Sequence, residues 1–505
     1  MENSPDGINP TKQLDLAPNI KLGIATHAHP ITMMIRSLIL TALCLCSSLQ
    51  AAERPNILFI LADDMGFGDL GCYGSSQIKT PALDALAANG VKFTDGYVSA
   101  PVCAPSRAGL LTGRYQQRFG FEHNLHSPHY LKPEKAGIPL DETTVAQRLK
   151  NLGYRTGLIG KWHVGSYLPE HHPNARGFDF FFGMLGGGHT YWPTLKKNSL
   201  LRNREKISEI RTPYLTDWFS REAEDFITQD SQNPWFLFLS YNTPHTPMQA
   251  KEEDLKAYSH ISPKRRQIYC AMQKCMDDNI AQIISKLKAT KQLENTLIVF
   301  CSDNGGSVTA SSAINAPLNG MKGCFLEGGI RVPMIMHWPA GLKPGQTYSH
   351  PVITLDFTPT FVHLAGGKVE EEIVGSGKRA YKKTRDGVNL IPFLQGQKQG
   401  SPHQALFWRM AIRGSAVRSG QWKLIQTPHH PTMLFDLSND LAEQHNLAPS
   451  MPEKVAELTN LYADWAESLK ANPMWISDNF WSAYNKKLYD IDYDLTQPTG
   501  NTTKH

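Results

Sequence analysis

The sequence has few cysteines, and none of them forms the close pair that is typical of zinc sites. Eight cysteines occur among 505 residues, without any Cys-x-x-Cys spacing, so a thiolate zinc site is not expected. Six of the eight follow residue 53: Cys72, Cys103, Cys270, Cys275, Cys301 and Cys324. Six are too few for a disulfide framework in a chain of this length, and their pairing cannot be read from the sequence.

Long runs of basic residues are also missing. The chain has 51 Lys and Arg against 46 Asp and Glu, a net charge of +5, and no basic stripe alternates with aromatic residues. These features argue against nucleic-acid binding, whereas a mild positive excess suits an anionic substrate. Hydrophobic residues make up 41% and charged residues 19% of the chain, which predicts a globular protein with one large and one smaller domain.

No apolar run is long enough to span a bilayer, so stable membrane insertion is not expected. Residues 33–52 nevertheless resemble a secretory signal peptide, because Arg36 precedes an apolar run of about ten residues and small residues end it. We therefore expect an exported protein, periplasmic or secreted. Cys44 and Cys46 raise a lipoprotein alternative, but a leucine precedes each of them. Residues 1–32 have no pattern, and we interpret them as a mis-called extension before a start at Met33 or Met34.

From residue 54 to about 370, apolar runs alternate with amphipathic segments. This alternation predicts an α/β domain with a large, mostly parallel sheet between layers of helices. The expected strands are residues 56–62, 155–160, 235–241 and 296–301. The expected helices are residues 80–90, 143–152, 214–227 and 264–288.

A second unit is predicted for residues 371–505. A polar, glycine-containing stretch at 370–385 separates it from the first unit, and no internal repeat is evident. Residues 406–409, 415–425 and 433–437 have the pattern of antiparallel strands with turns, and residues 452–469 that of an amphipathic helix. We expect a small α+β domain with a short antiparallel sheet and a packed helix.

Polar residues follow each predicted strand of the first unit. They are Asp63-Asp64, Lys161-Trp162-His163, Asn242-Thr243-Pro244-His245 and Ser302-Asp303-Asn304. The carboxyl ends of parallel strands lie along one edge of a sheet, which is where open α/β folds bind ligands. Packing alone does not explain why polar residues follow four strands at the same edge of the sheet.

The polar residues that follow two of these strands predict a metal site. Asp63, Asp64, Asp303 and Asn304 offer hard oxygen ligands only, and this chemistry selects Ca²⁺ or Mg²⁺ over zinc. Taken separately, each pair also fits helix capping or a turn. At the ends of two apolar strands they favour a metal.

Five cationic or titratable side chains complete the predicted site: Arg107, Lys161, His163, His245 and Lys322. Together with a metal and a helix N-terminus they would bind a tetrahedral anion. Taken singly, a lysine after a strand is usually solvated and a histidine is usually structural. Lys322 by itself would not indicate a functional site.

The stretch Cys103-Ala104-Pro105-Ser106-Arg107 is the centre of the pattern. Pro105 suits the first position of a helix and Gly113 its end, so we expect Cys103 just before the N-terminus. A cysteine there is either a low-pKa nucleophile, the precursor of a more reactive group, or a small core residue.

Extended by Ala108-Gly109-Leu110-Leu111-Thr112-Gly113-Arg114, this stretch resembles the signature of the type I sulfatases, of the alkaline-phosphatase-like superfamily. The resemblance covers about residues 54–470, with Cys301 as an unusual neighbour of the metal ligands. It implies that a separate maturing enzyme oxidises Cys103 to formylglycine. It also implies a Ca²⁺ site made by Asp63, Asp64, Asp303, Asn304 and the modified residue. Arg107, Lys161 and Lys322 then hold the formylglycine or the sulfate, and His163 and His245 are the active-site histidines.

The implied activity is hydrolysis of sulfate esters, and an exported enzyme of mild positive charge suits a sulfated polysaccharide or glycosaminoglycan. We expect substrate contacts from His189, Trp192 and Trp408, although such aromatic residues are equally common in cores. Two alternatives remain: a phosphodiesterase or phosphonate monoester hydrolase of the same superfamily, and a non-catalytic binder of sulfated glycans. A cysteine-dependent phosphatase is disfavoured, because only three residues separate Cys103 from Arg107.

Overall fold

The computed structural model describes residues 54–125, 136–197, 199–229, 232–369, 373–374, 381–469, 472–476 and 486–495. The predicted signal peptide, the segment before it and the predicted boundary after residue 370 lie outside these ranges. The described residues, from Arg54 onward, belong to one compact unit.

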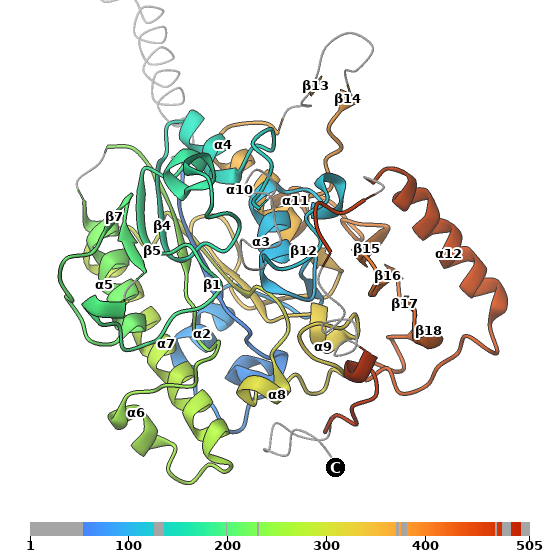
Figure 1. Ribbon diagram of the computed structural model, residues 1–505. Helices are drawn as coiled ribbons and strands as arrows, with labels where there is room; N and C mark the ends of the chain where they lie inside the picture. Colours follow the sequence, from blue (N-terminus) through green and yellow to red (C-terminus); the bar gives the residue numbers. More distant parts are fainter. Residues whose placement is uncertain are drawn as a thin grey trace, which may run out of the picture. The chain divides into compact units, whose positions relative to one another are not determined.

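A large sheet runs through the described part of this unit (Figure 1). Its order is β11 (Gln346–Tyr348), β2 (Val91–Phe93), β10 (Met334–His337), β9 (Thr296–Ser302), β1 (Asn56–Ala62), β8 (Trp235–Ser240), β4 (Arg155–Lys161), β5 (Phe180–Met184), β6 (Leu200–Arg202) and β7 (Glu205–Lys206). The five central strands from β9 to β5 are parallel, whereas β10 and β6 run antiparallel to their neighbours. The predicted, mostly parallel sheet is confirmed.

Both faces of the sheet are covered, which explains why its strands are continuous apolar runs. Along β1, Ile57 and Phe59 point to one face and Leu58 and Ile60 to the other. The first face packs against α3 (Cys103–Thr112), α4 (Val145–Asn151) and α10 (Phe357–Leu364). The second packs against α2 (Pro81–Ala88), α5 (Leu215–Thr228) and α7 (Lys264–Ala289).

A four-stranded antiparallel sheet follows in the C-terminal part, as predicted. It consists of β15 (Ala405–Met410), β16 (Gly414–Ser419), β17 (Trp422–Thr427) and β18 (His430–Asp436). The long helix α12 (Pro452–Glu467) packs against it through Leu458 (Figure 1). The stretch predicted as strand 415–425 is a hairpin, because Gly420 has a φ of 56° and turns the chain.

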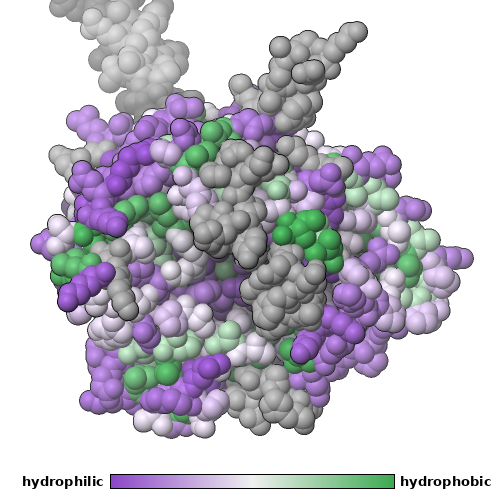
Figure 2. All heavy atoms as spheres, in the orientation of Figure 1, coloured by the Kyte–Doolittle hydropathy of each residue, from purple (hydrophilic) through white to green (hydrophobic). Residues whose placement is uncertain are grey.

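The remaining elements are short. They are β3 (Gly96–Tyr97), β12 (Val352–Ile353), β13 (Ile373–Val374), β14 (Tyr381–Lys382), α6 (Glu252–Ala257), α8 (Val308–Ser311), α9 (Glu327–Ile330) and α11 (Ile391–Leu394), with several 3₁₀ turns between them. In the described part of the chain, none of the helices combines the length and the apolar character that a membrane span requires. On the face shown in Figure 2, hydrophilic residues predominate and hydrophobic ones form small separate groups.

Candidate active site

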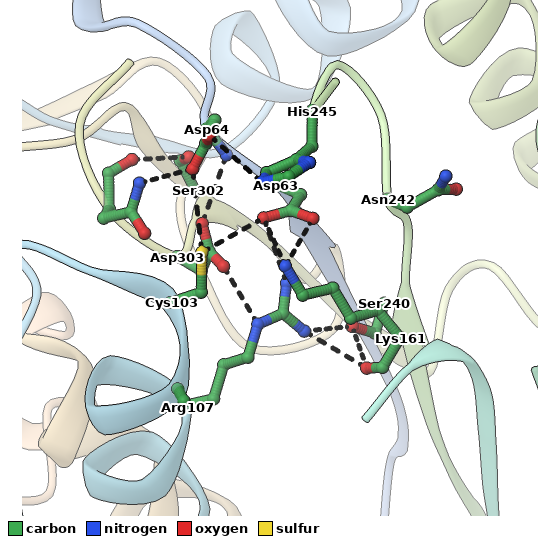
Figure 3. Close-up of polar contacts among 12 residues, drawn as sticks. Asp63, Asp64, Cys103, Arg107, Lys161, Ser240, Asn242, His245, Ser302 and Asp303 are labelled. Atoms are coloured by element: carbon green, nitrogen blue, oxygen red, sulfur yellow. Dashed lines mark hydrogen bonds and ion pairs between the residues drawn. The ribbon is translucent and has the colours of Figure 1, made fainter. Parts of the chain in front are cut away.

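Four adjacent strands of the large sheet end at one edge and carry the predicted polar residues. In the order β9, β1, β8 and β4, they lead into Asp303, Asp63, Asn242 and His163. Figure 3 shows that side chains from all four strands converge on one small region, where Cys103 and Arg107 approach from α3. The parallel order of the strands therefore assembles residues that are far apart in the sequence.

Cys103 is the first residue of α3 and is almost completely buried. The predicted start at Pro105 is too late by two residues, since the helical conformation begins directly after Val102. The predicted end is confirmed, because Gly113 adopts a φ of 68° and closes the last turn. Cys103 thus lies in the first turn, where backbone N–H groups favour negative charge.

Asp63 accepts hydrogen bonds from the Lys161 ammonium group at 2.7 and 2.9 Å. Both side chains are fully buried. Asp63 also lies 3.6 Å from the Cys103 sulfur and 3.7 Å from a guanidinium nitrogen of Arg107. An ion pair removed from water in this way is stable only when its other polar contacts are satisfied.

Arg107 links α3 to the end of β9. Its Nε donates to Asp303 at 2.9 Å, and its Nη1 donates to the hydroxyl of Ser240 at 2.6 Å and to the Lys161 carbonyl at 3.1 Å. Burial opposes the ionisation of Asp303, but Arg107 and Lys161 outweigh burial and hold its pKa below the ordinary value.

Asp64 has a similar arrangement and lies 3.8 Å from the Cys103 sulfur. Lys322 Nζ donates to its two oxygens at 2.7 and 2.8 Å and contacts the Cys103 sulfur at 3.1 Å. Asn304 Nδ2 donates to Asp64 at 2.7 Å, and His245 Nε2 lies 3.6 Å from it. Burial raises the pKa of Asp64, but Lys322 and His245 prevail, so the carboxylate stays ionised.

The Cys103 thiol is held in its neutral form. Burial is the main cause that raises its pKa, and Asp303 adds to the effect, against the opposing charges of Lys161 and Lys322. A thiol in this state is a poor nucleophile, since the thiolate is the reactive species. A buried, neutral thiol disfavours the low-pKa nucleophile among the alternatives left open by the sequence.

The charges of the cluster are balanced. Three carboxylates, on Asp63, Asp64 and Asp303, face three cationic groups, on Arg107, Lys161 and Lys322. A divalent cation would leave the cluster with a net positive charge. Such a site attracts an anionic substrate.

The oxygen donors of the cluster fit a hard cation. Ligand atoms of Asp63, Asp64, Cys103 and His245 lie within 4.8 Å of one another. The Asn304 Oδ1 is buried and has no hydrogen-bond partner among the described residues, although buried carbonyl oxygens are normally paired. A free amide oxygen on a side chain that contacts Asp64 is suited to coordinate Ca²⁺.

The two histidines occupy different surroundings. His245 Nδ1 lies 2.7 Å from the Thr246 carbonyl, so this nitrogen carries the proton and Nε2 faces Asp64. His163 has no partner for Nδ1 among the described residues. Burial, followed by the charge of Lys161, holds the pKa of His163 well below 6.5 and keeps the ring neutral.

Comparison with known proteins shows the family of the chain. The sequence model of the family described as Sulfatase matches residues 55–367. The chain belongs to the sulfatase family. A second family model, described as N-sulphoglucosamine sulphohydrolase, C-terminal, matches residues 321–468. This sulfatase is accordingly a sulfuric ester hydrolase, and the alternative of a non-catalytic glycan binder is set aside.

Individual relatives agree with the family. Arylsulfatase J of Mus musculus is 36% identical over 392 residues, which cover 74% of this chain and 64% of that protein. Arylsulfatase A of Bos taurus is 34% identical over 474 residues, covering 82% and 87%. Among solved structures, Ps i-CgsB in complex with k-i-k-neocarrahexaose is 36% identical with a TM-score of 0.76, and the match covers 87% of this sulfatase and 98% of that chain.

Several residues of the sulfatase site were not singled out from the sequence. Ser240 anchors Arg107, and Ser302 accepts a hydrogen bond from the Met65 amide while donating to the Asn304 carbonyl. Both serines end apolar strands at the active-site edge, and this position is the one signal that could have found them. Asn124 accepts a hydrogen bond from the Ala104 amide at 2.9 Å, and nothing in the sequence indicates this contact.

The predicted substrate contacts have different outcomes. Trp408 is fully buried, and its indole N–H donates to the Val98 carbonyl at 2.7 Å. The prediction that it contacts substrate is wrong, because its position on β15 faces the core. Trp192 is 41% exposed, and His189 is nearly buried with Nδ1 2.7 Å from the Thr190 carbonyl. For these two residues the prediction stays untested.

Proposed function

We propose that this sulfatase removes sulfate groups from a sulfated polysaccharide or glycosaminoglycan, with residue 103 oxidised to formylglycine and Ca²⁺ bound beside it. One observation carries the proposal. The Cys103 sulfur lies in the first turn of a helix, 3.1 Å from Lys322 and 3.6 Å from Asp63. A group at this point lies beside two carboxylates that would hold a cation, beside Lys322, and within 4.8 Å of a ring nitrogen of His245.

Formylglycine and Ca²⁺ would supply the chemistry that the neutral thiol lacks. The hydrate of formylglycine would offer a hydroxyl as nucleophile for sulfur, and a bound cation would polarise the sulfate oxygens. The carboxylates of Asp63, Asp64 and Asp303 with the carbonyl oxygen of Asn304 would hold Ca²⁺ in preference to Mg²⁺.

The side chains around residue 103 divide the remaining tasks. Lys161 and Lys322 bind the sulfate oxygens and stabilise charge that develops on them. His245 keeps one proton on Nδ1 for the Thr246 carbonyl, so it must carry a second proton on Nε2 to protonate the departing alkoxide. His163 is neutral and would accept the proton of the remaining hydroxyl while the C–O bond to sulfate breaks, which releases sulfate and restores the aldehyde. Arg107 fixes Asp303 and the first turn of α3.

Two observations support the proposed substrate class. The similar protein Ps i-CgsB was crystallised with k-i-k-neocarrahexaose, and Trp192 offers an exposed ring on which a sugar could stack. The proposal also includes export by the signal peptide at residues 33–52 and a maturing enzyme as partner. N-terminal sequencing of the native protein tests the export.

Mass spectrometry tests the central claim. The tryptic peptide from Phe93 to Arg107 of active enzyme should contain an aldehyde or its hydrate in place of the thiol. Intact thiol in fully active enzyme would refute the proposal, as would a Cys103→Ala variant that keeps most of its activity.

Turnover experiments test the reaction and the substrate. The enzyme should hydrolyse aryl sulfates faster than aryl phosphate diesters, and the reverse order would favour the phosphodiesterase alternative. A panel of defined sulfated oligosaccharides then identifies the sugar. Treatment with a chelator should abolish turnover, and added Ca²⁺ should restore it.

A further inference from the structure

Two segments near the C-terminus, residues 472–476 and residues 486–495, pack against the active-site loops. Neither is covered by the matched family models, which end at residue 468. Trp475, Leu488 and Tyr493 are buried in the hydrophobic core that also contains Phe325. The dark red segment beside α9 in Figure 1 is part of 486–495.

The first segment contacts the loop that follows α3. Trp475 stacks edge-on against Phe121 with ring centroids 4.7 Å apart, and its indole N–H donates to the Asn124 carbonyl at 3.1 Å. The side chain of Asn124 in turn accepts a hydrogen bond from the Ala104 amide at 2.9 Å. Trp475 is therefore connected, through one residue, to the helical turn that carries Cys103.

The second segment contacts the loop that carries Lys322. The Tyr489 hydroxyl accepts a hydrogen bond from the Phe325 amide at 2.9 Å. The neighbouring Asp490 pairs with His430 of β18 at 2.9 Å. The segment thus lies between the small sheet and the Lys322 loop.

This loop needs external support. Residues 312–326, between α8 and α9, form no strand or helix. The backbone at Lys322 is therefore not held by the hydrogen bonds of a regular element. The Gly323 amide donates to the Pro101 carbonyl at 2.8 Å, and Cys324 closes a turn onto Met321. The Tyr489 hydroxyl bonds to Phe325, the residue that directly follows this turn.

We propose that Tyr489 and Trp475 are positioning residues for the reaction, with Tyr489 acting on Lys322 and Trp475 acting on the first turn of α3. The proposal rests on the function proposed above. Catalytic groups must be held to within a fraction of an ångström by their support, and a loop without regular structure receives that support from its packing.

The test uses Tyr489→Phe, which keeps the ring and removes the hydroxyl. Its matched control is Tyr493→Phe, because the Tyr493 hydroxyl donates to the Leu488 carbonyl within the same segment. We expect kcat/KM for an aryl sulfate to fall about tenfold in Tyr489→Phe, and to change less than about twofold in the control. The unfolding temperature and the formylglycine content should match those of the wild type in both.

A double-mutant cycle asks whether Tyr489 acts through Lys322. In a Lys322→Ala background, Tyr489→Phe should change kcat/KM by less than about twofold, because the group that it positions is gone. A full tenfold loss in that background would refute the assigned route. For the other contact, Trp475→Phe retains the stacking on Phe121, and it should lower kcat/KM without lowering the unfolding temperature.

Hydrogen exchange provides a readout that is independent of activity. Amides of residues 319–326 should exchange faster in Tyr489→Phe than in the wild type or in Tyr493→Phe. Equal exchange in the two variants, or an unchanged kcat/KM in Tyr489→Phe, would overturn the proposal. Failure of the proposed function is distinct, because the wild type would then hydrolyse no sulfate ester while the exchange experiment remained valid.

Discussion

Two residues of the site, Asp64 and His163, have backbones in the left-handed region, with φ of 66° and 60°. This conformation costs a residue other than glycine about 1–3 kcal/mol. Each lies just after a strand and is held by a hydrogen bond from its own amide, to Asp303 at 3.2 Å and to the Leu185 carbonyl at 3.2 Å. The strain at these two positions is consistent with a functional constraint on their side chains.

His163 should act as a base. We expect His163→Ala to lower kcat by about 10²- to 10⁴-fold, while mass spectrometry still finds residue 103 modified. Because the pKa of His163 lies well below 6.5, the wild type should keep its kcat as the pH falls through 6.5. Wild-type kcat in the alanine variant would contradict this role.

Asn304 should contribute an oxygen to the cation. Its Oδ1 has no partner among the described residues, so Asn304→Leu should weaken Ca²⁺ binding at least about tenfold. Calorimetric titration of metal-free protein measures this. Asn304→Asp retains the oxygen and should bind, and equal affinity of the leucine variant and the wild type would remove Asn304 from the ligand set.

At the scale of elements, the loop between β5 and β6 connects the two histidines. The Tyr191 hydroxyl contacts the carbonyl oxygens of Asn242 and His245 at 2.5 and 2.8 Å. In the same loop, Gly187 lies directly against the ring of His163. The loop therefore supports both residues from one side.

A matched pair of glycines tests this contact. A Cβ at residue 187 would lie 2.7 Å from His163 Nε2, whereas a Cβ at residue 186 would meet nothing within 4 Å. We expect Gly187→Ala to lower kcat about tenfold or more by displacing the ring. Gly186→Ala should leave the kinetics unchanged, and similar kinetics of the two variants would refute the explanation.

At the scale of the whole molecule, a buried ionic network joins the small sheet to the catalytic part. Lys423 of β17 pairs with Glu327 of α9 at 2.7 Å and with Glu443 at 2.8 Å. Burial opposes the charge of Glu327, but Lys423 and Arg331 lower its pKa to about 2. Burial raises the pKa of Glu443 to about 7, and Glu327 adds to the rise against Lys423.

The raised pKa of Glu443 makes stability depend on pH. Its folded value of about 7 exceeds the ordinary 4.5, so the folded state binds the extra proton in this window. The free energy of unfolding should therefore fall as the pH rises from 4.5 to 7, by up to about 1.4 kcal/mol per pH unit. In Glu443→Gln this contribution is absent, and urea titrations at several pH values should show a flatter profile. Parallel profiles of variant and wild type would contradict the assignment.

Much of the site could be predicted from the sequence, because it depends on local pattern. Continuous apolar runs indicate buried parallel strands, and the residues after them must lie at one edge of the sheet. Asp63, Lys161 and Asp303 follow from this rule alone. The stretch from Cys103 to Arg114 gave the reaction class through its resemblance to the sulfatases, which the family match supports.

Other features depend on contacts between distant parts of the chain, which local pattern does not contain. Lys322 lies in a loop without regular structure and meets Cys103 across 219 residues of sequence. Trp408 faces the core instead of the substrate, since its contacts with Tyr97 and Val98 decide its exposure. The sequence by itself thus determined the strands, the motif from Cys103 to Arg114 and the types of side chain at the active-site edge of the large sheet. The tertiary structure alone decided which loops, and which C-terminal segments, come to lie against that edge.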